Sequence, residues 1–129
     1  MKLVYPVVFT RLDDGYMAYV PDLEINTQGN GFAEAIEMAR DAIGVMGIDM
    51  EDDNKPIPEP SDLSQISYGM NEIVSIIDID LTAYRRANEQ RTVRRNVSLP
   101  SWLNVEAEKA GINVSAVLQT ALKKELHME

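Results

Sequence analysis

The sequence predicts an α+β fold in two parts: an antiparallel sheet with one packed helix, followed by a smaller strand-helix-helix unit. Three observations indicate this. β-rich segments separated by turn signals come first, apolar residues then recur at helical spacing, and a basic strand is later followed by Pro and two amphipathic helices. We therefore expect one domain over residues 1–88 and a second over residues 91–129.

A β-hairpin is expected at the start of the first domain. Residues 2–10 are rich in Val, Tyr and Phe, and Asp13-Asp14-Gly15 is a turn signal before a second strand at 16–20. Residues 23–28 can add a third short strand. From Phe32 the apolar period changes to three and four residues, which predicts a helix of about 15 to 19 residues across the hairpin.

The second half of this domain mixes a loop with one more strand. Residues 51–67 contain three prolines among acids, which predicts a surface loop. The apolar run 73–79 is typical of a strand buried on both faces, in the middle of a sheet. Residues 81–87 favour one helical turn, and the polar residues 88–90 are the expected linker.

A basic strand is expected at residues 91–100, which hold three arginines and no acid in a chain of net charge −9. Alternate residues of a strand face opposite sides. One side would carry Val93, Val97 and Leu99, and the other Arg94, Asn96 and Ser98. A first helix is expected from 100 to 110, ended by Gly111, and a second from the N-cap Asn113 to about Leu126.

Strand, Pro and two helices in this order are the layout of a ribbon-helix-helix DNA-binding unit. Because about 40 residues bury a core poorly and an unpaired strand aggregates, we expect two chains to pair as a homodimer. The two-stranded ribbon fits the major groove, with Arg94, Asn96 and Ser98 reading bases. Phosphates would be held by Arg95 and by the helix start at Asn113, Val114 and Ser115. The alternative is an edge strand whose arginines only prevent aggregation.

Charge divides the chain. Residues 1–80 carry four bases and sixteen acids, a net charge of −12, whereas residues 81–129 carry +3. The acidic part would repel nucleic acid, so the two parts should bind different partners. The chain has no Cys and no apolar run long enough to span a membrane, which predicts a soluble cytoplasmic protein.

Catalysis is not expected. Asp78 and Asp80 share a strand face and Asp22 follows another strand, so a metal-dependent nuclease is conceivable in principle. However, no His precedes His127, and no metal-ligand spacing occurs. We predict no catalytic residue, no metal and no cofactor.

The whole chain resembles the HicB antitoxins of bacterial type II toxin-antitoxin systems. The matching residues are Tyr5-Pro6-Val7-Val8-Phe9, Gly15-Tyr16, Tyr19-Val20-Pro21-Asp22-Leu23, Thr27-Gln28-Gly29, Glu34-Ala35-Ile36, residues 39–42, 77–85, 97–103 and 110–115. The sequence departs from the family pattern at Glu24-Ile25-Asn26, where Pro-Gly-Cys is frequent, and at Gly31, where Thr or Ser often caps the helix.

The resemblance implies a partial, catalytically inactive RNase H-like domain that binds and masks a HicA-type mRNA-cleaving toxin. It also implies that the second domain binds operator DNA and represses the chain's own operon. We expect the toxin to contact the acids Asp13, Asp14, Asp22 and Glu24. The sequence leaves two assemblies open, a homodimer and a tetramer made of two homodimers. The alternatives are a stand-alone ligand-responsive repressor and an active RNase H-like nuclease.

Overall fold

The structure is a computed structural model that describes residues 1–89 and 92–128. The chain divides into two compact units, Met1–Arg91 (unit 1) and Thr92–Glu129 (unit 2). Gln90 of the predicted linker, Arg91 of the predicted strand and Glu129 lie outside the described residues. Within the described ranges, every helix is too short or too polar to cross a membrane.

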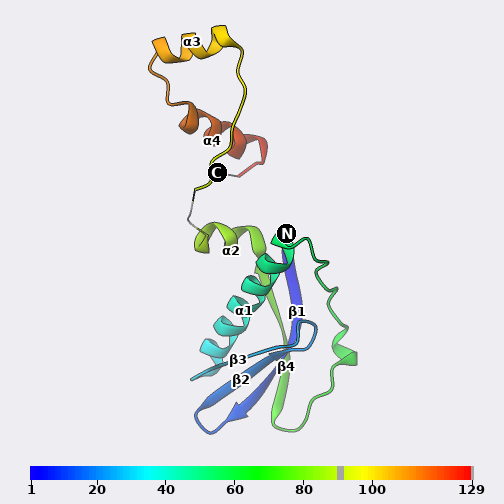
Figure 1. Ribbon diagram of the computed structural model, residues 1–129. Coiled ribbons are helices and arrows are strands. Elements are labelled where there is room, and N and C mark those ends of the chain that lie inside the picture. Colours follow the sequence, from blue (N-terminus) through cyan, green and yellow to red (C-terminus); the bar gives the residue numbers. More distant parts are fainter. Residues whose placement is uncertain (90–91, 129) are drawn as a thin grey trace. The chain divides into compact units, whose positions relative to one another are not determined.

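Unit 1 is built on a four-stranded antiparallel sheet of order β3-β2-β1-β4 (Figure 1). Its strands are β1 (Lys2–Leu12), β2 (Gly15–Val20), β3 (Ile25–Gly29) and β4 (Glu72–Asp80). The predicted hairpin is confirmed, since β1 and β2 pair around the Asp13-Asp14 turn. The third strand begins two residues later than predicted, because residues 21–24 form a turn.

The core of unit 1 lies between the sheet and α1 (Phe32–Asp52). Alternate residues of β1 supply its sheet side, and the helix supplies small residues such as Ala35 and Ala39, which let it approach closely. The buried β1 residues in this cluster are Leu3, Tyr5, Val7 and Phe9. The helix begins at Phe32 as predicted, but it is 21 residues long and starts from Gly31 without a side-chain cap.

A second helix, α2 (Leu81–Asn88), packs beside α1. It has eight residues rather than the single turn predicted, and it includes Asn88 of the predicted linker. Glycine makes the close approach possible: a Cβ at Gly44 would lie 2.8 Å from the Tyr84 ring. The Tyr84 hydroxyl donates to Asp41 Oδ1 at 2.7 Å, and Arg85 pairs with the end of α1.

The position predicted for the apolar strand was wrong. β4 is an edge strand, and Ile73 and Ile76 are each about half exposed. Only Ile77 and Ile79 are buried within this strand. The apolar run is not buried on both faces, because Ile76 lies on the face of the sheet opposite α1. On that face a cavity lies between Ile76 and Leu63 of the loop.

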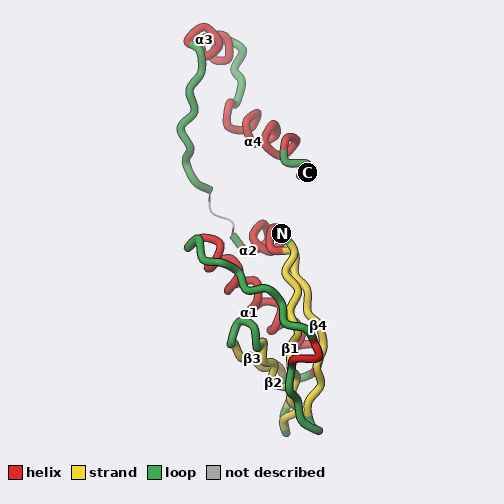
Figure 2. Tube along the Cα trace, turned by 90° about the vertical axis from the view of Figure 1, so that its right-hand side faces the viewer, coloured by secondary structure: helices red, strands yellow, loops and turns green. Residues whose placement is uncertain are grey.

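The long connection from α1 to β4 runs beside the sheet (Figure 2). It is mostly irregular as predicted, but α1 continues to Asp52 and a 3-10 turn forms at Leu63–Gln65. Asp62 caps that turn by accepting from the Ser64 N–H at 3.0 Å. This hydrogen bond and a second one from the Ser64 hydroxyl lower the pKa of Asp62.

Unit 2 contains α3 (Ser101–Lys109) and α4 (Val114–Glu125), close to the predicted bounds. Gly111 has a φ of +65°, the left-handed conformation expected after a helix end. Asn113 caps α4 as predicted. Residues 92–100 form no strand within the chain, and because the predicted ribbon pairs two chains, it stays a prediction.

Candidate functional site

The basic segment before α3 is accessible along its whole described length. Residues 92–100 are all exposed, including Arg94, Arg95, Asn96 and Ser98. Both sides of the predicted alternation are therefore open in the single chain. The polar set Arg94, Asn96 and Ser98 is accessible to an anionic partner. The apolar set Val93, Val97 and Leu99 is not covered by other residues of the chain.

Most apolar side chains of unit 2 are also exposed. Neither α3 nor α4 buries a single described residue. The exposed set in this unit is Val93, Val97, Leu99, Trp102, Leu103, Val105, Ile112, Val114, Val117, Leu122 and Leu126. Apolar side chains at such positions in helices normally pack into a core. In a single chain of this protein they remain uncovered and form an apolar surface.

The start of α4 presents free backbone donors. The Asn113 side-chain oxygen accepts a hydrogen bond from the Ala116 N–H at 3.1 Å, and the Asn113 backbone carbonyl accepts one from the Val117 N–H. Within the described residues the N–H groups of Val114 and Ser115 have no partner. Together with the positive end of the helix dipole, they suit a phosphate oxygen.

The acids of unit 1 do not form one cluster. Asp13 and Asp14 are exposed in the turn between β1 and β2, whereas Asp22 and Glu24 lie in the turn between β2 and β3. These turns flank β2, so about 17 Å of strand separates them. The four predicted toxin contacts thus belong to two separate places on the sheet.

Asp22 is already engaged in holding the loop. It accepts hydrogen bonds from the Ser61 N–H at 3.1 Å and the Ser61 hydroxyl at 2.5 Å. Tyr5 lies close by, and the pKa of its hydroxyl is raised by burial and then by the charges of Asp22 and Glu59. Glu24 is exposed beside this group and has a φ of +54°, a strained value for a non-glycine residue.

The carboxylates considered for metal binding have separate structural tasks. Asp78 pairs with Lys2 at 3.3 Å, and Asp80 caps α2 by accepting from the Ala83 N–H at 3.1 Å. Across residues 1–89 and 92–128, no group of three His, Cys, Asp or Glu side chains is placed to hold a metal ion. The described residues therefore offer no cluster of metal ligands around Asp78 and Asp80.

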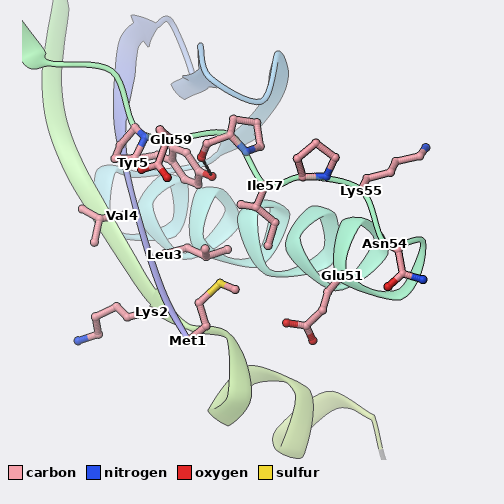
Figure 3. Close-up of a pocket in the computed structure, with 13 residues that line it drawn as sticks. Met1, Lys2, Leu3, Val4, Tyr5, Glu51, Asn54, Lys55, Ile57 and Glu59 are labelled. Carbon is pink, nitrogen blue, oxygen red and sulfur yellow. Dashed lines mark hydrogen bonds between the residues drawn. The ribbon is translucent and has the colours of Figure 1, made fainter.

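Sequence reasoning missed one site on unit 1. A cavity of about 730 Å³ lies between the first residues of β1 and the proline-rich loop. Its lining includes Lys2, Val4 and Tyr5 on the strand and Ile57 and Glu59 on the loop (Figure 3). No local pattern signals it, because it depends on which part of β1 the neighbouring strands leave uncovered.

Solved structures with a similar fold come from toxin-antitoxin systems. One belongs to a toxin-antitoxin complex from Streptococcus pneumoniae, with a TM-score of 0.63 and 23% identity over 97% of this chain and 99% of that chain. The antitoxin HicB of Burkholderia pseudomallei gives a TM-score of 0.55 and 19% identity over 96% and 98%. A chain of a HicA3 and HicB3 complex gives 0.51 and 24% over 60% and 99%.

At this identity the structures show the shared mixed α+β fold. No curated protein matches the chain significantly. The family profile described as "HicB_like antitoxin of bacterial toxin-antitoxin system" matches residues 5–121, which is most of the sequence and includes parts of both units. This chain therefore belongs to the HicB-like antitoxins of bacterial toxin-antitoxin systems.

Proposed function

We propose that this antitoxin masks a HicA-type mRNA-cleaving toxin through residues 1–88 and represses its own operon through residues 91–129. In this proposal the first domain is a partial RNase H-like fold without activity, and the second is a ribbon-helix-helix module. The observation that carries it is the contrast between an acidic unit with its own core and a unit without a buried residue among those described, in which most apolar side chains are exposed.

Charge supports the choice of unit 1 for the toxin. Three of the four bases in residues 1–80 are paired with acids of the same unit, as in Lys2–Asp78, Arg40–Glu37 and Lys55–Asp53. The large surplus of acids thus remains available to a basic partner. A toxin that binds RNA needs a basic surface, and complementary potential speeds its association with an acidic one.

Exposure supports the choice of unit 2 for dimerisation and DNA. Two copies of residues 92–100 pairing antiparallel would place Arg94, Asn96 and Ser98 twice on one face of a ribbon. The helices would then cover the opposite face with their exposed apolar residues. The free N–H groups at Val114 and Ser115 would contact phosphates beside the groove.

The test separates the two units in cells and in solution. The full chain and residues 1–89 should both rescue cells that express the toxin, whereas only the full chain should dimerise and bind the operator. Rescue by residues 92–129 alone would overturn the assignment of toxin binding. An equal oligomeric state for full-length and truncated chains would overturn the assignment of the dimer interface.

The same proposal holds that the protein cleaves no RNA or DNA by itself. Asp78 and Asp80 are occupied by an ion pair and a helix cap, which supports this. Nuclease activity of the pure protein should be absent with Mg²⁺ or Mn²⁺. Metal-dependent cleavage that disappears in Asp78→Ala or Asp80→Ala would contradict the proposal.

A further inference from the structure

The first half of β1 has an open side. β1 pairs with β4 from Lys2 to Thr10, but it pairs with β2 only from Val8 to Leu12. Within the described residues, no strand lies beside residues 2–7 on the β2 side. A strand that is central at one end of the sheet is therefore an edge strand at the other.

Two hydrogen bonds show which backbone groups of β1 face β4. The Leu81 N–H donates to the Met1 carbonyl at 2.8 Å, and the Arg11 N–H donates to the Asn71 carbonyl at 3.3 Å. Both bonds continue the β1–β4 register. Because alternate residues of an antiparallel strand turn their backbone groups to opposite sides, the odd residues of β1 serve β4.

The even residues of β1 therefore direct their backbone groups to the other side. On the open half these groups are the N–H of Lys2 and Val4 and the carbonyls of Lys2, Val4 and Pro6. Pro6 fits this assignment, since its missing N–H costs no bond to β4. The open half thus presents a row of donors and acceptors with the spacing of a β-ladder.

A groove borders this row. The cavity of about 730 Å³ has residues 1–5 on one side, residues 54–60 on the other and Glu51 at one end. In Figure 3, α1 lies behind the groove and Leu3 and Ile57 point into it. The space beside the free backbone groups is thus lined by apolar side chains as well.

The loop holds the groove open and cannot fill it as a strand. The Tyr5 hydroxyl donates to the Pro58 carbonyl at 2.6 Å, and the Lys55 N–H donates to the Met50 carbonyl at 2.8 Å. These two hydrogen bonds hold the loop segment 54–60 that lines the groove. Its three prolines lack the N–H groups that a ladder needs. The free groups of β1 are therefore left to water or to a segment of another chain.

Charge indicates what kind of segment fits. The two lysines of the lining are occupied, Lys2 by Asp78 at 3.3 Å and Lys55 by Asp53 at 3.9 Å. Glu59 forms no ion pair within the described residues, and its charge reaches Tyr5 at the same end of the groove. The Met1 ammonium, also in the lining, donates to Thr82 Oγ1 at 3.2 Å. The uncompensated charge at the Tyr5 end of the groove is therefore negative.

We propose that the open half of β1 binds an extended, basic segment of a partner protein, which adds as a strand beside residues 2–6. This rests on the proposed function, and the partner is the toxin. About five residues of the segment would pair with β1, with alternate apolar side chains over Leu3 and Ile57 and a base near Glu59.

Hydrogen exchange of single amides tests this directly, using the full chain with and without the toxin. In the free protein the Lys2 and Val4 amides should exchange fast, while the neighbouring Leu3 and Tyr5 amides are protected by β4. Toxin binding should slow the first pair at least about tenfold and leave the second pair unchanged. The odd residues thus serve as the internal control for the even ones.

Charge reversal gives a second readout. Glu59→Lys should weaken toxin binding about two- to fivefold, the range of an exposed ion pair. Glu34→Lys changes the net charge equally at the start of α1, where Glu34 is exposed and does not line the groove, and should leave the affinity nearly unchanged. Equal effects of the two variants would mean that charge acts only at long range, which would overturn the groove as the contact.

Toxin binding and hydrogen exchange together distinguish failure of the proposed function from failure of this inference. If the toxin does not bind the full chain, the proposed function fails and the inference with it. If the toxin binds while Lys2 and Val4 exchange at unchanged rates, only the inference is overturned. Protection of these amides in the free protein that depends on its concentration would assign the edge to a second copy of the chain, and would also overturn it.

Discussion

Substituting Val117 in α4 by Asp should dissociate the proposed dimer. Val117 has 56% of its surface exposed in the single chain and lines an apolar cavity with Ala116 and Ala121. Complete burial of a valine contributes about 1.5 to 3 kcal/mol, so covering the exposed half contributes roughly 1 kcal/mol per chain. By two-fold symmetry the loss is about 2 kcal/mol, or about a 30-fold higher dimer Kd, before the cost of burying a carboxylate.

Sedimentation velocity over a range of concentrations measures this shift. Val45→Asp is the matched control, because Val45 is 49% exposed on α1 and should lie outside the dimer interface. It should leave the dimer Kd unchanged. An unchanged dimer Kd for Val117→Asp, or an equal shift for the two variants, would refute the assignment of the interface to unit 2.

Three further predictions follow from single side chains. Arg94→Ala should cost about 1 to 3 kcal/mol on the operator and far less on a scrambled duplex, whereas Arg95→Ala should weaken both equally; binding at matched salt measures the ratio. Burial and the bond to Asp41 raise the pKa of Tyr84 to about 12, above its usual 10, so stability that is full below pH 10 should fall between pH 10 and 12. Tyr84→Phe should flatten that fall in denaturant titrations, and an equally steep fall would contradict it. Glu24→Gly should raise the free energy of unfolding by about 0.5 to 1 kcal/mol, because glycine adopts the positive φ without strain; no gain in melting temperature would argue against strain there.

Elements set by local signals were predictable from the sequence. The Asp13-Asp14-Gly15 turn fixed the hairpin, and Gly111 and Asn113 marked the boundary between α3 and α4. These residues act through their own backbone conformation or through a hydrogen bond three residues away. Such effects are independent of the rest of the fold.

Features that depend on strand pairing were not predictable. The run 73–79 is apolar enough for a central strand, but its place at the edge follows from β1 pairing with β2 on its other side. The open half of β1 has the same origin, since it exists only because β2 ends at Val20 while β1 extends to Lys2. The sequence likewise does not reveal that Asp13 and Asp14 lie in one turn while Asp22 and Glu24 lie in another, and their contact with the toxin stays a prediction.

The distribution of the core predicts how each activity depends on concentration. Every buried hydrophobic residue in the described ranges lies between Leu3 and Leu81, so unit 1 has a core within one chain. In the proposed dimer, unit 2 would gain a core by association, and its folding would then be coupled to dimerisation. Diluting the protein below its dimer Kd should therefore abolish operator binding while leaving the toxin affinity per chain unchanged. Parallel loss of both activities on dilution would show that unit 1 also needs the dimer.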